Sequence, residues 1–131
     1  MTSKKAIGII GALSFFVAPT FPALAHHSFA MFDNTKTISI SGKVKEYQFT
    51  NPHAWLMLTD SKGVVWSFEF GGGPSALIRA GITKASFVAG EVVTVTAQPL
   101  RDGRPGGSVL LIRKSNGQEL SPRIAPAGAA K

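Results

Sequence analysis

Residues 37–49 read TISISGKVKEYQF, and their apolar and polar side chains alternate with a period of two. The apolar residues Ile38, Ile40 and Val44 share one face, which is typical of a half-buried β-strand. Gly42 interrupts the alternation at a place where a long strand needs a bulge or a bend. We therefore expect this segment to form the long first strand of a curled sheet.

The rest of the chain alternates in a similar way, with one helix-like interruption. Further strands are expected over 53–59, 64–70, 91–98 and 108–113, and a short helix over 74–81. The expected helix has Pro74 near its start and Gly81 at its end, which is the usual asymmetry of helix termini.

This element order predicts a mainly all-β fold, a small five-stranded OB-like barrel with one short helix between strands three and four. An open sheet or a small sandwich is the alternative, because periodicity does not show which strand edges meet. The expected interior consists of the inward-facing apolar residues of the five strands, namely Ile38, Ile40, Val44, Leu56, Leu58, Trp66, Phe68, Val93, Val95 and Leu110.

The first 25 residues have the pattern of a secretory signal peptide. Lys4 and Lys5 provide the positive start, an apolar run covers 6–18, and Ala23-Leu24-Ala25 is a small-residue cleavage site. Cleavage after Ala25 leaves a mature chain that begins at His26. The apolar run is shorter than the about 20 residues that span a bilayer, so we expect an exported, periplasmic or secreted protein with no stable membrane anchor.

Four regions follow from these patterns. We expect a signal peptide over 1–25, an N-terminal arm over 26–36, an OB-like barrel domain over 37–120 and a disordered tail over 121–131.

Composition narrows the chemistry of the mature chain. The 131 residues contain no cysteine, which excludes disulfides, thiolate chemistry and a lipoprotein anchor. The formal charge of the whole chain is +7, and loss of Lys4 and Lys5 leaves 12 basic and 7 acidic side chains, or +5. A positive balance favours anionic partners. Since export removes most nucleic acid from reach, an anionic envelope component is the expected partner of this kind.

Several motifs together resemble a known family. They are Ala25-His26-His27-Ser28-Phe29, Gly42-Lys43-Val44, Thr50-Asn51-Pro52-His53-Ala54-Trp55-Leu56, Gly73-Pro74-Ser75-Ala76-Leu77 with Arg79 and Gly81, and Gly90-Glu91-Val92-Val93-Thr94-Val95. This combination resembles an exported bacterial family called domain of unknown function 6152, over essentially the whole mature domain. The resemblance implies an exported small β domain and names no reaction. The family often has an acid where this chain has Phe70, with Glu69 just before it.

All three histidines lie in these motifs, two at the mature N-terminus and one after the Asn51-Pro52 turn. An α-amine beside an imidazole is a bidentate nitrogen donor that suits Cu(II). The amine and Nδ1 of His26, with a ring nitrogen of His53 or His27, would form the T-shaped site called a histidine brace. The amine, the His27 amide and the His27 imidazole form a second possible ligand set. The leading hypothesis is therefore a non-enzymatic, exported binding module whose candidate ligand is a transition metal, copper, held by His26, His27 and His53. The alternative is that His26 and His27 are solvated terminal residues and that His53 caps or stacks at the start of a strand.

A second group of residues predicts a binding face. Alternation places His53, Trp55 and Met57 on one strand face, where imidazole, thioether and indole suit Cu(I), with Met31 as a further donor. The rival hypothesis is an envelope interaction module that presents the barrel face around Tyr47, Phe49, Trp55, Met57 and Trp66 to a protein, glycan or anionic ligand.

Signatures of catalysis are sparse. The chain has no recognisable Ser/His/acid spacing and no carboxylate cluster, so we expect a binding module, and a copper oxygenase is the third hypothesis. Gly71–Gly73 precede the expected helix without the lysine and spacing of a P-loop. We interpret them as a strand-to-helix connection whose glycines adopt positive φ.

Overall fold

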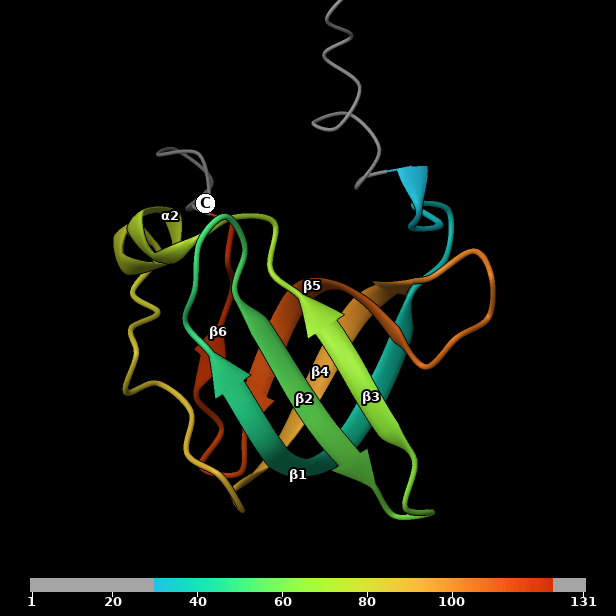
Figure 1. Cartoon of the computed structure of the whole chain (residues 1–131). Coiled ribbons are helices and arrows are strands. Elements are labelled where there is room, and N and C mark those ends of the chain that lie inside the picture. Colours follow the sequence, from blue (N-terminus) through green and yellow to red (C-terminus); the bar gives the residue numbers. More distant parts are fainter. Residues whose placement is uncertain (1–29, 124–131) are drawn as a thin grey trace, which may run out of the picture.

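The computed structural model of the protein describes residues 30–123, which form a small β-barrel and one short helix (Figure 1). The elements are β1 (Ile38–Gln48), β2 (Trp55–Asp60), β3 (Val65–Glu69), α2 (Pro74–Arg79), β4 (Val92–Pro99), β5 (Gly106–Lys114) and β6 (Glu119–Leu120). Each of the five predicted strands and the predicted helix is present, with ends that differ by one or two residues. The two-residue β6 was not expected.

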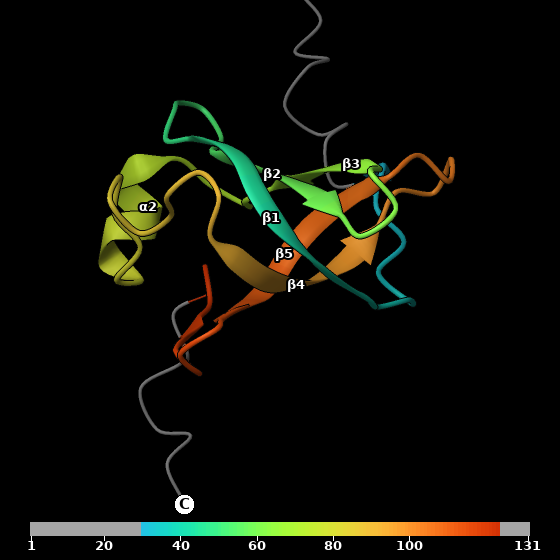
Figure 2. The same ribbon diagram turned by 90° about the horizontal axis from the view of Figure 1, so that it is seen from below.

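The sheet closes on itself through the pairing of β3 with β5. Its strand order is β3-β2-β1-β4-β5-β6, and β3 also pairs with β5 in parallel, from Ser67 with Gly106 to Glu69 with Ser108. Seen from below, β1, β2 and β3 form one wall and β4 and β5 the other (Figure 2). The five-stranded OB-like barrel is therefore confirmed, and the sheet is not open.

β1 pairs with a strand of each wall, and Gly42 lies where the two pairings overlap. Gly42 pairs with Asp60 in β2 and with Val93 in β4. A Cβ atom at Gly42 would lie 2.6 Å from the carbonyl oxygen of Thr59, so glycine permits this close approach. The bulge expected at Gly42 lies slightly further along, between Val44 and Glu46.

The barrel interior contains nearly all of the expected residues. Val44, Leu56, Leu58, Phe68, Val93 and Val95 are buried, and Ile38, Ile40 and Trp66 are partly buried against them. Leu110 is the exception, because the pairing shifts there from Thr96–Leu111 to Ala97–Val109 and leaves Leu110 as an extra residue. Val109 and Ile112 are the buried hydrophobic residues of β5 on either side of it.

α2 and the N-terminal segment lie on opposite sides of the barrel in both views (Figures 1 and 2). Leu77 of α2, and Ile82 and Phe87 after it, are buried in the core cluster. Within residues 30–123, no helix is long and apolar enough to cross a membrane. The predicted signal peptide, residues 26–29 of the predicted arm and residues 124–131 of the predicted tail lie outside the described residues.

Candidate functional site: a histidine–glutamate pair beside an apolar pocket

The outer face of the β2–β3 hairpin changes character along its length. At the hairpin turn Thr59 pairs with Val65, which is 39% exposed. At the opposite end Trp55 pairs with Glu69, which is only 7% exposed. A carboxylate at this depth needs a hydrogen-bonding or charged partner, because desolvation of an unpaired charge is costly.

The partner of Glu69 is His53, the residue two positions before β2. Nδ1 of His53 contacts Oε1 of Glu69, so the imidazole and the carboxylate form a hydrogen-bonded pair. The Glu69 side chain is 9% exposed and the His53 side chain 26%. The carboxylate is therefore enclosed, while part of the imidazole still reaches the surface.

A close packing of two glycine- and proline-containing segments positions His53. The amide of Ala54 donates to the carbonyl of Gly72 (3.3 Å), and the amide of Phe70 donates to the carbonyl of Ala54 (3.0 Å). A Cβ atom at Gly73 would lie 2.5 Å from Oδ1 of Asn51 and 2.8 Å from the carbonyl oxygen of Pro52. The loop that carries His53 thus rests directly on the segment that follows Glu69.

This packing corrects the interpretation of Gly71–Gly73. None of the three is among the described glycines with positive φ, and Gly73 has φ −91° and ψ −171°, which other residues also adopt. Glycine is needed at position 73 for space rather than for backbone freedom. The Asn51-Pro52-His53 motif and the glycine triplet, which are far apart in the predicted pattern, are one structural unit.

Glu69 also lines an apolar pocket of about 310 Å³. The pocket lies between the outer face of β2–β3, the loop that joins β4 to β5, and the start of the described chain. Its other lining residues are Met31, Phe32, Trp55, Ser67, Leu100, Arg104 and Pro105.

The chain reaches this pocket along a fixed path. The amide of Arg101 donates to the carbonyl of Met31 (2.9 Å), and the amide of Asp33 donates to the carbonyl of Pro99 (2.8 Å). Phe32 forms a bridge with Leu100 and is buried. The N-terminal segment is therefore attached to the barrel at the pocket, as expected for Met31 and Phe32. His26, His27 and Phe29 lie outside the described residues.

The described residues contain two members of a potential metal site rather than a complete one. Over positions 30–123, no group of three or more His, Asp or Glu side chains is arranged to hold a metal ion. His53 and Glu69 are together, and any further nitrogen ligand from a histidine must come from His26 or His27, the other two histidines of the sequence.

The structure divides the predicted binding face into two groups. Trp55 and Met57 lie on the outer face of β2, whereas Tyr47, Phe49 and Trp66 pack against the core. Burial raises the pKa of Tyr47 to about 12, and its hydroxyl has no hydrogen-bond partner within the part of the chain that the structure describes. Nε1 of Trp66 donates to Oδ2 of Asp60 (2.9 Å).

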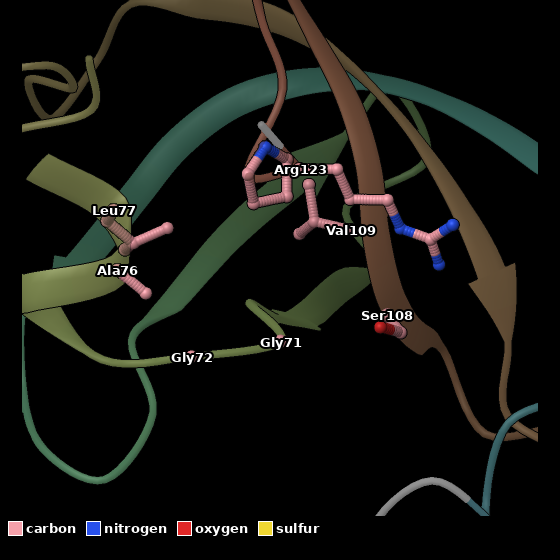
Figure 3. A pocket seen from close by; sticks show the side chains of 8 residues that line it. Gly71, Gly72, Ala76, Leu77, Ser108, Val109 and Arg123 are labelled. Carbon is pink, nitrogen blue, oxygen red and sulfur yellow. The ribbon is translucent and has the colours of Figure 1, made fainter. Parts of the chain in front are cut away.

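A smaller hollow of about 190 Å³ lies on the other side of the glycine segment. Figure 3 shows Gly71 and Gly72 on one side of it, and Ser108, Val109 and Arg123 on the other. Ala76 and Leu77 of α2 complete the wall. Arg123 is exposed, and the hollow contains no buried charge comparable to Glu69.

Glu69 is the site residue that the sequence pattern did not identify. The alternation of residues 64–70 already placed it on the outer face, where an exposed carboxylate is ordinary. The one sequence signal was its position two residues before the glycine triplet.

A comparison with known families confirms the predicted family assignment. The sequence model of a family of unknown function, DUF6152, matches residues 15–109. The chain belongs to this family. The match includes all three histidines, Glu69 and the glycine triplet. No curated protein is similar enough to the chain to match it.

Proposed function

We propose that this protein is an exported, non-enzymatic binding module that holds a transition metal, copper, at the His53–Glu69 end of its barrel. The observation that carries the proposal is the enclosed carboxylate of Glu69, paired with a histidine that still reaches the surface. The signal-peptide pattern supports export to the periplasm or the outside of the cell.

Glu69 prepares His53 for metal binding by occupying one of its two ring nitrogens. Metal-ligating histidines commonly donate the N–H of the other ring nitrogen to a carboxylate, which fixes the tautomer and the ring orientation. Because Nδ1 of His53 faces Glu69, Nε2 is the nitrogen left for a metal.

The mature N-terminus supplies the remaining ligands in this proposal. Cleavage after Ala25 gives His26 a free α-amine, and this amine with Nδ1 of His26 forms a chelate for Cu(II). The chain from His26 to Met31 spans five residues, at most about 18 Å when extended. Met31 and Glu69 line the same pocket, so the terminus can reach Nε2 of His53.

Copper titration of the mature chain tests this proposal. The protein should begin at His26, verified by intact mass, and Cu(II) should be titrated against a competing chelator by calorimetry. We expect 1:1 binding that His53→Ala weakens about tenfold or more, or about 1.4 kcal/mol. Thr59→Ser, on the outer face of the same strand at the hairpin turn, is the matched control and should leave the affinity unchanged.

Two outcomes would change the assignment. If His53→Ala leaves the affinity unchanged, copper is held by the His26-His27 terminus alone, and the structured site is wrong. If the wild-type mature chain binds no copper, the envelope interaction module becomes the better hypothesis, with the pocket beside Trp55 as its contact surface.

A further inference from the structure

We propose that the apolar pocket beside Glu69 is the seat of the chain's own N-terminal segment, residues 26–29, and that the ring of Phe29 fills it. The docking itself depends only on the pocket and on chain continuity. Its consequence, that His26 is held near His53, rests on the proposed function.

The described chain begins beside this pocket. Besides the Arg101–Met31 hydrogen bond, Nε of Arg101 donates to the carbonyl of Ala30 (3.1 Å). Two successive residues are thus fixed to the β4–β5 loop, and Met31 is part of the pocket wall. Phe29 is the residue that precedes Ala30 in the sequence.

The pocket suits an aromatic ring in both volume and polarity. Its volume of about 310 Å³ exceeds the about 150 Å³ of an apolar cavity that accommodates benzene. Met31, Trp55, Leu100 and Pro105 give it mainly apolar walls. Met31 remains 43% exposed, and its flexible thioether side chain can adapt to a neighbouring ring.

The four residues that precede Ala30 combine one large apolar side chain with groups that can carry positive charge. They read His26-His27-Ser28-Phe29, so Phe29 is the one large apolar side chain among them. The residues further from the pocket carry imidazoles and, after cleavage, an α-ammonium group. These groups complement the carboxylate of Glu69, which lies in the pocket wall. Apolar contact and charge therefore favour the same orientation of the segment.

The experiment is NMR spectroscopy of the mature chain in the absence of metal. We expect nuclear Overhauser contacts between the Phe29 ring and the Met31 methyl group or the Leu100 methyl groups. Phe29→Ala should shift the Met31 methyl and Trp55 indole signals, and leave the Trp66 indole signal in place as an internal reference. Ser28→Ala is the matched control and should shift neither reporter.

The proposal is overturned if Phe29 shows no contact with the pocket and Phe29→Ala leaves both reporters unchanged. Contacts that disappear on dilution would also overturn it, because they would come from a second copy of the chain. Since no metal is present, the result is independent of copper binding. Contacts without copper affinity would contradict only the proposed function, and copper affinity lost in His53→Ala without contacts would contradict only the docking.

Discussion

The two faces of the β2–β3 hairpin are buried for different reasons, although successive residues of the same two strands alternate between them. The inner face is apolar, and its residues Leu56, Leu58 and Phe68 are fully buried. The outer face begins with an exposed Val65 and ends with the enclosed Glu69. Burial on the inner face is explained by the hydrophobic effect alone. The hydrophobic effect does not explain the burial of the Glu69 carboxylate, which requires its pairing with His53.

This contrast shows which residues of a small barrel indicate a functional site. A buried apolar residue on an inner face contributes to stability, whereas a buried charge on an outer face indicates a functional site. The following experiments test whether the two faces of this hairpin really separate stability from binding.

The largest expected effect is on the inner face. Phe68→Ala removes a fully buried ring and should lower the free energy of unfolding by about 3–5 kcal/mol. Met57→Ala, on the outer face of the neighbouring strand, should cost much less. Urea unfolding followed by circular dichroism measures both, and equal losses for the two variants would show that the faces do not differ in this way.

The next effect concerns the support of the outer site. Gly73→Ala places a Cβ atom against Asn51 and Pro52, and overpacking of this kind costs about 1–3 kcal/mol. It should also weaken Cu(II) binding, because the loop that carries His53 must move. Gly71→Ala is the matched control, since a Cβ atom there meets nothing within 4 Å. If both variants behave alike, the close approach at Gly73 does not position the site.

The carboxylate itself should affect binding more than folding. Glu69→Ala removes the partner of His53 Nδ1, and loss of such a partner typically reduces metal affinity by about 10–100-fold. Val65→Thr, on the same face of β3 but at the hairpin turn, should leave the affinity unchanged. Calorimetric Cu(II) titration of both variants measures the effect, and wild-type affinity in Glu69→Ala would show that the pair has no role in metal binding.

The smallest expected effect is at the hairpin turn. The indole of Trp66, followed by the amides of Val64 and Lys62, lowers the pKa of Asp60. Since the folded pKa is depressed, Asp60 contributes stability above its unfolded pKa of about 3.9, and this contribution disappears as the pH falls through the folded value.

Asp60→Asn should therefore be slightly less stable than wild type at pH 7 and approach it in acid. Urea midpoints of the two proteins between pH 7 and pH 3 provide the check. A difference between the midpoints that does not change with pH would remove the electrostatic interpretation.

The sequence predicted the inner face of the barrel better than the outer face, because the inner positions follow from a local pattern and the outer site does not. The inward positions of Val44, Leu56 and Phe68 follow from a period of two, which is a local property of the chain. The bulge that leaves Leu110 out of the core depends on the register between two strands, and no local pattern contains it. The contact of Gly73 with Asn51 and Pro52, and the enclosure of Glu69, depend on the approach of distant segments. His53 was predicted as a ligand from its residue type and turn position, but its partner became visible only once β2 and β3 were paired.

In the proposed site, one metal ion joins His53 to the mature N-terminus. Paramagnetic broadening tests it directly, by addition of one equivalent of Cu(II) to the ¹⁵N-labelled mature chain that begins at His26. We predict loss of the amide signals of 51–55 and 69–73 together with those of the N-terminal residues, while the signals of the distant hairpin turn, 61–64, persist. Broadening confined to residues 26–29 would contradict the claim.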